Sequence, residues 1–455
     1  MRITPIYETL LKLRTGQVRS SDLSRACLDA IHDPAGEGAL AFIRVYDCAK
    51  DIPANGPLAG LPISIKDLFD VEGEPTTAGS TLLRHSTPAR NDAVVVQRLK
   101  SAGAVLVGKT NMTEFAFSGL GLNPHHGTPR NAFDRENARI PGGSSSGAAV
   151  SVTDGMSHAA IGSDTGGSVR IPAALCGLTG FKPTARRIPL DGVLPLSPSL
   201  DSIGPIAPTV ACCELIDSVM SAESCSPVKT ARISDVRVGV LQGYILHGLE
   251  PEVARAFQDA LDVFSRSGAK VESVEFSCLD NILSANAKGG FSAPESFAWH
   301  RSLLEEYSDE YDPRVLSRIM RGRDLSAADY LDLLAARKRI IHSAQSAFDG
   351  FDAIVLPTTP RVAPRISDLV TSDAAYFDAN IAMLRNPSVF NFLDGTALSI
   401  PCHRPGQPPV GLMIAGLAMW DKKIFGVGKA LEAALTEAGC ATHCAGSKAL
   451  EQIHR

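Results

Sequence analysis

The sequence predicts an α/β fold, in which strands and helices alternate along the chain and pack in layers. Two observations support this prediction. Apolar residues recur with the period of a strand in some segments and with the period of a helix in others, and no internal repeat has a fixed period. The chain also has 455 residues, 44% of them hydrophobic, which is ample for a large core in one big domain or in a few smaller ones.

The first strand that the sequence predicts comes after two helices. Amphipathic patterns predict helices over 5–14 and 21–31. The segment LAGLPISIKDLFDV alternates apolar and polar residues in its middle, which predicts a strand that ends near Lys66 and Asp67.

The next unit is a helix followed directly by a strand. A helix is expected over 92–102, with Asn91 or Asp92 as its cap and Gly103 at its end. Residues 104–107 are apolar and predict a short buried strand.

Beyond this strand the pattern becomes less regular. Residues 111–118 are expected to form a helix, with Asn111 as its cap and Glu114 three residues later. From 121 to 210 glycine, serine and proline are dense, but the stretch is too apolar for a linker, so we expect turns that hold a functional site.

After about residue 225 the alternation of strands and helices returns. The expected order is a strand over 236–241, a helix over 251–267, a strand over 270–276, mostly helical structure over 295–347, a buried strand over 351–357 and a helix over 420–438.

The charge balance argues against some classes of partner. The formal net charge is -5 and neither sign dominates, so we expect neither a nucleic-acid nor a membrane-surface partner. The start of the chain carries charges among its apolar residues, which argues against a signal peptide. No apolar run is long enough for a transmembrane helix. The ten cysteines form no CxxC pair, which is typical of reduced thiols in a cytoplasmic protein and predicts no metal site.

The stretch GAVLVGKT, residues 103–110, matches the pattern of a phosphate-binding P-loop. A P-loop needs a strand before its first glycine and a helix after its lysine. Here the order is reversed, because a helix precedes Gly103 and the residues AVLV prefer a strand. We therefore predict no nucleotide site, and Lys109 is expected to be structural.

A second short pattern, G-x-S-x-G over residues 143–147, is typical of a nucleophile elbow centred on Ser145. An elbow requires a strand directly before it, whereas a proline and two glycines precede this serine. A glycine–serine loop is therefore favoured over an elbow.

The stretch SDTGGSVR, residues 163–170, is a stronger candidate for an active-site turn than the G-x-S-x-G pattern. Its two glycines tolerate backbone conformations that turn successive N–H groups inward, so they can surround an anion as an oxyanion hole does. These N–H groups belong to Thr165, Gly166, Gly167 and Ser168. The alternative is that this stretch forms a tight turn with no catalytic role.

A serine nucleophile needs a base, and no histidine stands out in the sequence. Lysine acts as a base only when it is neutral, a state that burial favours. Lys66 follows an apolar segment and is the candidate, although such a lysine can also extend to solvent.

Taken together, PISIKD, PGGSSSG and GSDTGGSVRIPA resemble the amidase signature family of Ser-Ser-Lys hydrolases. Further matches, among them DAIVLPTTP and PVGLMIAG, extend the resemblance over residues 55–415. It implies one amidase domain over 1–455, with a mixed central sheet wrapped by helices, a signature core over about 55–215 and a more variable helical region over about 225–350.

The resemblance also assigns roles to individual residues. It places the lysine at Lys66, the bridging serine, held by an unusual cis peptide, at Ser144, and the nucleophile at Ser168. The oxyanion donors are then the backbone N–H groups of the turn named above. Polar residues that support the centre match Ser145, Asp164 and Arg170. Neither a metal nor a cofactor is implied.

The expected activity is hydrolysis of a small amide through an acyl-enzyme. Alternatives are the glutaminase component of an amidotransferase complex, a hydrolase of carboxybiuret, allophanate or hydrazide substrates, and a non-catalytic binding protein. A homodimer is left open.

The substrate pocket is less well marked in the sequence. Phe115, Phe117 and Ser118 are candidate lining residues, and residues 383–392 are expected opposite them. The aromatic residues favour a neutral, apolar acyl group, whereas an arginine such as Arg385 is the alternative and would bind a carboxylate.

Overall fold

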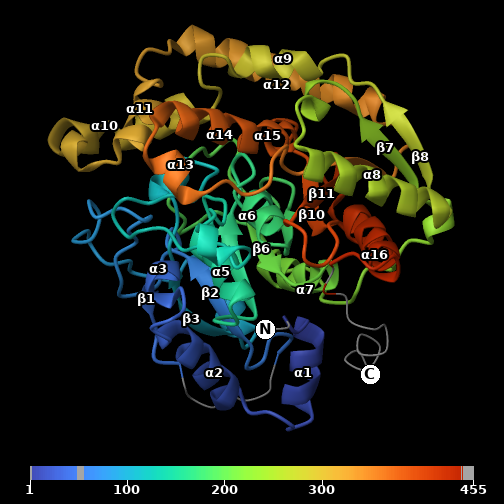
Figure 1. The fold of residues 1–455 in the computed structure, drawn as a ribbon. Coiled ribbons are helices and arrows are strands. Elements are labelled where there is room, and N and C mark those ends of the chain that lie inside the picture. Colours follow the sequence, from blue (N-terminus) through green and yellow to red (C-terminus); the bar gives the residue numbers. More distant parts are fainter. Residues whose placement is uncertain (1–2, 49–55, 442, 444–455) are drawn as a thin grey trace.

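The centre of the fold is one mixed sheet of eleven strands (Figure 1). The structure is a computed structural model that describes residues 3–48, 56–441 and 443. Its strands follow the order β1-β3-β2-β4-β6-β5-β10-β11-β9-β7-β8. Their bounds are β1 Phe42–Val45, β2 Pro62–Lys66, β3 Val105–Thr110, β4 Ala159–Ser163, β5 Thr179–Lys182, β6 Ile203–Ala207, β7 Arg237–Leu241, β8 Lys270–Val274, β9 Ala353–Pro357, β10 Thr396–Pro401 and β11 Gly411–Gly416.

The sheet is parallel in two places and antiparallel between them. Strands β3, β2 and β4 pair in parallel, and so do β9, β7 and β8. The strands from β4 through β6, β5, β10 and β11 to β9 pair antiparallel, as β1 does with β3 at the edge. Parallel neighbours end at the same edge of a sheet, so β2 and β4 bring their last residues close together.

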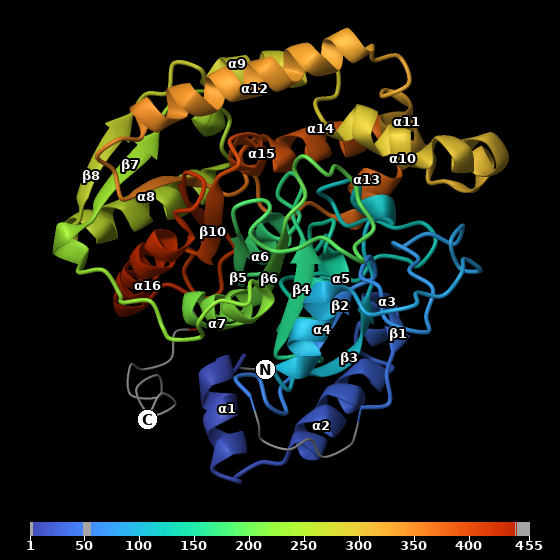
Figure 2. The ribbon, with the colours of Figure 1, turned by 180° about the vertical axis from the view of Figure 1, so that it is seen from behind.

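Helices cover both faces of the sheet (Figures 1 and 2). Their bounds are α1 Ile6–Arg14, α2 Ser20–His32, α3 Gly38–Ala41, α4 Val94–Ser101, α5 Ser146–Thr153, α6 Arg170–Leu175, α7 Val210–Met220, α8 Pro251–Arg266, α9 Leu279–Asn286, α10 Ser292–Tyr307, α11 Pro313–Met320, α12 Ala327–Ala347, α13 Ile366–Val370, α14 Asp373–Arg385, α15 Pro387–Phe392 and α16 Asp421–Glu437.

The side chains of β11 lie in two hydrophobic cores, one on each face of the sheet. Leu412 and Ile414 pack with α7, α8 and α16 on one face, whereas Met413 and Ala415 pack with α12 and α15 on the other. Successive side chains of a strand point to opposite faces, so a strand buried on both sides is apolar throughout. This is why strands such as AIVLP in β9 read as continuous apolar runs.

Most elements agree with the sequence prediction. The α/β fold class with a mixed sheet is confirmed, as are the helices at 5–14, 21–31, 251–267 and 420–438. The stretch that resembles a P-loop is also as expected, because α4 ends before Gly103, which has φ +89°, and β3 follows.

Two local predictions near the site are wrong. Only a short 3-10 turn, Glu114–Ala116, forms within 111–118, because Phe115 and Ala116 adopt positive φ and the Glu114 side chain is bonded elsewhere. Helix α4 begins after Ala93 without a side-chain cap, since Asp92 instead pairs with Lys100 at 2.7 Å.

The glycine-rich region holds more regular structure than its composition indicates. Between 121 and 210 the chain forms α5, β4, α6, β5 and β6. The short turns between these elements carry the predicted site residues, so the expectation of turns around a site applies to the connections only.

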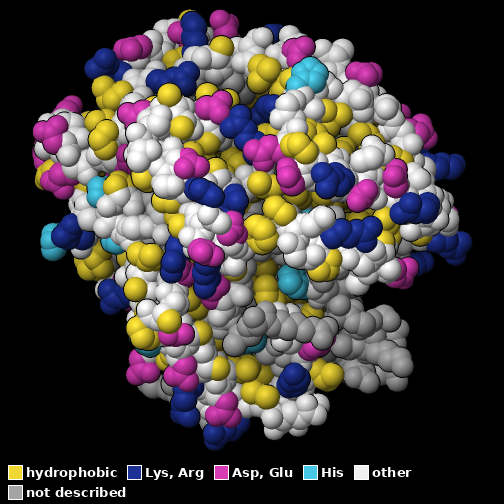
Figure 3. All heavy atoms as spheres, viewed as in Figure 1, with side chains coloured by type: hydrophobic (Ala, Val, Ile, Leu, Met, Phe, Trp, Pro, Cys, Tyr) yellow, Lys and Arg dark blue, Asp and Glu magenta, His cyan; other side chains and the backbone are white. Residues whose placement is uncertain are grey.

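Several properties of the described residues bear on the class of protein. The face in Figure 3 intersperses Lys and Arg with Asp and Glu. Within the described ranges, no helix is both long and apolar enough to cross a membrane. The nine cysteines that the structure describes are free thiols.

The close approach of β5 and β6 gives a test of the sheet. A Cβ atom at Gly204 would lie 1.9 Å from the backbone oxygen of Phe181, so Gly204→Ala must displace a central strand. We expect it to lower the free energy of unfolding by about 3 kcal/mol, as overpacking does. Urea unfolding measures this loss.

The matched control for that variant is Gly36→Ala. Its new methyl would meet nothing closer than 3.3 Å, so we expect a change within about 0.5 kcal/mol. Equal stabilities for the two variants would contradict the described register of β5 and β6.

Candidate active site

The carboxyl ends of β2 and β4 bring a lysine and a serine together. Ile65 of β2 lies opposite Ile161 of β4, so Lys66 and Ser163 finish the two strands side by side. The Lys66 Nζ lies 2.6 Å from Ser144 Oγ and 2.8 Å from Ser163 Oγ. All three side chains are buried, so the amine is bound by two hydroxyls away from solvent.

Ser144 is presented by the loop before α5. The Gly143–Ser144 peptide is cis, as the resemblance predicts. A Cβ at Gly143 would lie 2.4 Å from the Gly121 nitrogen, so only glycine allows this loop to come so close to the neighbouring chain segment. The Ser144 carbonyl accepts a hydrogen bond of 3.1 Å from the Thr113 N–H, which fixes the serine above the end of β2.

The surroundings of Lys66 favour its neutral form. Burial lowers the pKa of the Lys66 amine to about 7, and the carboxylates of Asp201 and Asp164 act in the opposite direction. Within the described part of the chain, Lys66 forms no ion pair. Burial therefore favours the neutral form of this amine near neutral pH.

Two other buried lysines provide a comparison. Lys182 donates to the carbonyls of Pro183 and Gly395, at 2.6 and 2.7 Å, and burial lowers its pKa to about 8. Lys109 lies 3.7 Å from an Asp67 oxygen and donates to the Pro75 carbonyl, and burial lowers its pKa as well. Only Lys66 among these three is in contact with serine hydroxyls, so the predicted structural role suits Lys109.

The predicted oxyanion turn differs in one residue from the expectation. Gly167 has φ +129°, and its N–H donates to Asp164 Oδ1 at 2.8 Å. That N–H is already used inside the turn, which corrects the expected set of four donors to three. Among the described residues, the N–H groups of Thr165, Gly166 and Ser168 have no hydrogen-bond partner.

An ion pair buried behind the turn holds it in shape. Asp164 Oδ1 lies 2.9 Å from Arg170 Nη2, and both side chains are fully buried. Asp164 also accepts hydrogen bonds from the Val169 N–H and from the Asn391 amide. Burial alone would raise the pKa of the Asp164 carboxyl, but the Arg170 guanidinium holds this pKa well below its ordinary range.

Ser168 lies at the end of this turn, next to the loop that carries Ser144. The Ser145 N–H donates to the Ser168 carbonyl at 3.3 Å, so adjacent backbone links the two predicted serines. The Ser145 hydroxyl itself points to the Ser163 carbonyl, at 3.5 Å. In the part of the chain that the structure describes, the Ser168 hydroxyl forms no hydrogen bond.

The three predicted pocket residues have different surroundings in the structure. Phe115 is a core residue, because its ring packs against His300 and Tyr311 at centroid distances of 4.4 and 5.3 Å. Phe117 lies under the guanidinium of Arg318, 4.6 Å from ring centroid to Cζ. The Ser118 hydroxyl donates to Asn380 Oδ1 at 3.0 Å.

The segment expected to lie opposite the pocket does contact the glycine turn. A Cβ at Gly166 would lie 3.4 Å from Leu384, and one at Gly167 would lie 2.6 Å from Pro387. Arg385 donates to the Ile245 carbonyl and to the Asn386 side chain.

Sequence reasoning missed three polar residues of the site. Ser163 could have been found from the parallel pairing of β2 and β4, since it ends the strand next to Lys66. Asp201 accepts a hydrogen bond from the Thr165 hydroxyl at 2.5 Å, and burial raises its pKa to about 6. Asn391 lies within the 383–392 segment expected opposite the pocket, but the sequence does not predict its hydrogen bonds to Asp164 and Arg170.

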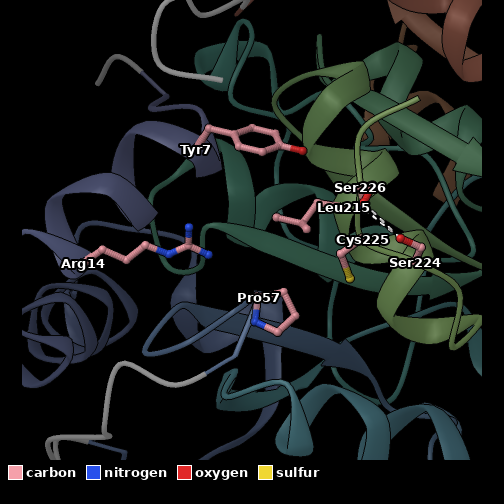
Figure 4. Close-up of a pocket in the computed structure, with 7 residues that line it drawn as sticks. All are labelled: Tyr7, Arg14, Pro57, Leu215, Ser224, Cys225 and Ser226. Atoms are coloured by element: carbon pink, nitrogen blue, oxygen red, sulfur yellow. Dashed lines mark hydrogen bonds between the residues drawn. The ribbon is translucent and has the colours of Figure 1, made fainter. Parts of the chain in front are cut away.

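Other candidate sites are less developed. Among the described residues, no three or more His, Cys, Asp or Glu side chains are grouped to hold a metal ion. A surface hollow of about 260 Å³ lies between α1 and α7 (Figure 4), lined by Tyr7, Arg14, Pro57, Leu215, Ser224, Cys225 and Ser226. None of the predicted site residues lines it.

Comparison with known proteins finds similarity to amidases. A family model described as Amidase matches residues 22–425. The chain is 34% identical to the 2-amino-5-chloromuconic acid deaminase of Comamonas testosteroni, over 88% of this chain and 86% of that protein. It is 32% identical to one component of the glutamyl-tRNA(Gln) amidotransferase of Roseiflexus castenholzii, its A subunit, over 94% and 96%. A crystal structure described as an amidase matches with a TM-score of 0.84 at 31% identity and covers 94% of this chain and 99% of that one.

The Asp164–Arg170 pair gives a stability prediction. Arg170→Met leaves the Asp164 carboxylate buried without its cation, so we expect a loss of about 4 kcal/mol in the free energy of unfolding. Urea unfolding at pH 7 measures it.

The control is Arg19→Met, which breaks the ion pair between Arg19 and Asp22. That pair is 67% and 45% exposed, so its loss is expected to cost less than about 1 kcal/mol. Similar losses for the two variants would contradict the bracing role of the buried pair.

Proposed function

The chain belongs to the amidase family, and on this basis we propose that it hydrolyses a small carboxylic amide to the acid and an amine or ammonia, with Ser168 as the nucleophile. The observation that carries the proposal is the 2.6 Å contact between Lys66 Nζ and Ser144 Oγ in a buried setting. An amine whose pKa is about 7 is a base of suitable strength at neutral pH.

The proposed proton relay runs from Ser168 through Ser144 to Lys66. The neutral Lys66 amine accepts the proton of the Ser144 hydroxyl, and Ser144 in turn takes the proton of Ser168. The Ser168 Oγ attacks the amide carbon and forms a tetrahedral intermediate. The same relay then returns the proton to the leaving nitrogen, the C–N bond breaks, and water hydrolyses the ester formed on Ser168.

The oxyanion of that intermediate is proposed to bind the free backbone donors of the glycine turn. The N–H groups of Thr165, Gly166 and Ser168 are candidates because no described residue accepts from them. Preorganised backbone donors stabilise charge without reorganising during the reaction, and one donor is typically worth about 3 kcal/mol. Ser145, Asp164 and Arg170 are proposed to support this turn rather than to react.

A second candidate function follows from the relatives. One of the similar proteins is named as a component of an amidotransferase, so this chain could release ammonia from glutamine for a partner protein. Purification of the chain alone, followed by assays with glutamine and with simple amides, separates the two functions. Hydrolysis of carboxybiuret, allophanate or hydrazide substrates would use the same serine. The free thiols suit a cytoplasmic location, which we also propose.

The lysine base predicts a pH dependence. Burial depresses the Lys66 pKa, so the reactive neutral amine is present above about pH 7 and is lost as the pH falls through that value. We expect kcat/KM to fall about tenfold per pH unit below the midpoint. A rate that stays constant from pH 8 to pH 5 would exclude Lys66 as the base.

The serine and the lysine give a direct mutational test. Ser168→Ala and Lys66→Met are each expected to lower kcat/KM by about 10⁴-fold, because the parts of a nucleophilic relay act as a unit. Steady-state kinetics on purified protein measure the loss.

The matched control for the serine is Ser151→Ala. Ser151 is equally buried but bonds to Ser64 and Ser157 outside the relay, so we expect its kcat/KM to stay within about threefold. A Ser168→Ala variant as active as this control would overturn the proposed nucleophile.

A further inference from the structure

A second cavity lies at the end of the sheet that is formed by β1, β3 and β2 (Figure 1). Its volume is about 400 Å³, which falls within the range of small-molecule sites in proteins. Five of its lining residues carry an acidic or basic side chain, namely Arg44, Asp67, Arg84, Lys109 and His126. The lysine and the serines of the proposed relay are not among its lining residues, so the cavity is distinct from the serine site.

The strand register explains why several of these charges meet. Arg44 of β1 lies opposite Lys109 of β3, and Lys109 lies opposite Ile65 of β2. Paired residues of neighbouring strands share a face of the sheet, and so do residues two positions apart, which places Asp67 on the face of Ile65. The order of the strands therefore sets a buried lysine between an arginine and a carboxylate.

Lys109 is buried with most of its hydrogen-bonding capacity unused. Its side chain is 1% exposed, and an ammonium group has three donors. In the described part of the chain its Nζ donates only to the Pro75 carbonyl, at 3.3 Å, and the nearer Asp67 oxygen is 3.7 Å away. Lys66 and Lys182, which are buried as well, each have two partners at 2.6 to 2.8 Å. A buried charge with unused donors at a cavity indicates that the cavity receives an acceptor.

Two further donors line the same cavity. The Nε2 of His126 is buried and has no hydrogen-bond partner among the residues that the structure describes. Arg84 is exposed and uses its Nε for the Thr81 carbonyl at 3.0 Å, and no carboxylate within the described ranges pairs with it. The adjacent His125 is not available in this way, because its ring contacts Glu114 at 2.7 Å.

Arg84 supplies the uncompensated charge of the cavity. Arg44 pairs with Glu74 at 3.0 Å, and the charges of Lys109 and Asp67 offset each other. Burial lowers the pKa of the unpartnered imidazole, so this ring is neutral near neutral pH and can donate from Nε2. The remaining positive charge matches a ligand that carries one negative charge.

Asp67 adds a second requirement, because it needs a donor from the ligand. Its Oδ2 accepts from the Gly79 N–H at 3.1 Å, whereas its Oδ1, which faces Lys109, accepts no hydrogen bond from any described residue. Asp70, another nearby carboxylate, does not line the cavity and accepts from the Thr76 hydroxyl at 2.5 Å. A ligand with several acceptors and one hydroxyl therefore satisfies both the cationic donors and the Asp67 oxygen.

We propose that this cavity binds a phosphate group that retains a proton, either as free phosphate or as the head group of a small phosphomonoester. Its oxygens accept from Lys109, His126 and Arg84. Its hydroxyl donates to the Oδ1 of Asp67. The second pKa of a phosphomonoester is about 6, so the singly charged form is present in weakly acidic solution. This inference is independent of the proposed hydrolysis, because no residue of the relay takes part.

Other small ions satisfy only part of this arrangement. Sulfate has no hydroxyl in weakly acidic solution, so it would place a negative charge against the Asp67 oxygen without a hydrogen bond. An ionised carboxylate lacks a donor in the same way. A zwitterionic amino acid offers a donor to Asp67, but it carries no net charge and leaves Arg84 uncompensated.

The proposed site does not restore the P-loop interpretation of GAVLVGKT. In a P-loop, the backbone N–H groups of the loop surround the phosphate. Here residues 105–110 form β3, whose backbone pairs with β1 and β2. The phosphate is bound by side chains from separate segments, and the lysine is the one residue of the pattern that contributes. Lys109 keeps its structural contact with Asp67 and also binds the ligand.

Titration calorimetry on the purified chain at about pH 6 tests the site. The probes are inorganic phosphate, glycerol 2-phosphate, sulfate and glycine at equal ionic strength. We expect at least one phosphate probe to bind about tenfold more tightly than sulfate, and glycine not to bind. Tighter binding of glycerol 2-phosphate assigns the site to phosphomonoesters, and tighter binding of inorganic phosphate assigns it to the free ion. No phosphate binding, or sulfate or glycine binding as tight as that of phosphate, would overturn the proposal.

The variants locate the binding in this cavity. Arg84→Gln removes an exposed charge and is expected to weaken phosphate binding at least about tenfold. Asp67→Asn keeps an acceptor for the Gly79 N–H but removes the repulsion of sulfate, so the preference for phosphate should fall to within about threefold. Lys109→Met should abolish binding, and Arg84→Gln remains decisive where Lys109→Met does not fold.

Arg90→Gln is the matched control, because Arg90 is an exposed arginine further along the same segment that does not line the cavity. We expect its affinity for phosphate to equal that of the wild type. Equal losses in Arg84→Gln and Arg90→Gln, or an unchanged affinity in Arg84→Gln, would reject the cavity as the phosphate site.

Discussion

A buried amine held between two hydroxyls is the constraint on which the rest of the site depends. Lys66 can occupy this position only because β2 ends there and the parallel neighbour β4 ends with Ser163 beside it. Burial disfavours the ammonium form, and hydroxyls, unlike carboxylates, do not restore it. The loop before α5 then places the Ser144 hydroxyl 2.6 Å from the amine. The central sheet therefore determines the protonation state of the proposed base.

The Asp164–Arg170 ion pair also limits the electrostatic stabilisation of a charged Lys66. Asp164 is close enough to Lys66 to raise its pKa, and an unpaired carboxylate there would act more strongly in that direction. Arg170 neutralises this charge, while the carboxylate orients the glycine turn through the Gly167 N–H. The pair thus shapes the donors of the turn without holding Lys66 in its charged form.

The sequence marks the proposed reactive residues more clearly than their surroundings, for a physical reason. Lys66, Ser144 and Ser168 lie in long ordered motifs, and the structure places these segments together. The helix expected at 111–118 does not form, because buried contacts of Glu114 outweigh local propensity. Asn391 reaches the Asp164–Arg170 pair only through tertiary packing, so no local pattern marks that contact.

The central claim is that Lys66 is a neutral amine at the pH where the enzyme would work. NMR titration of protein labelled with [ε-¹³C]lysine measures this directly, with Lys66→Met identifying the signal. The account predicts a chemical-shift midpoint near pH 7, several units below the value for an exposed lysine. A Lys66 signal that remains that of an ammonium group up to pH 9 would contradict it.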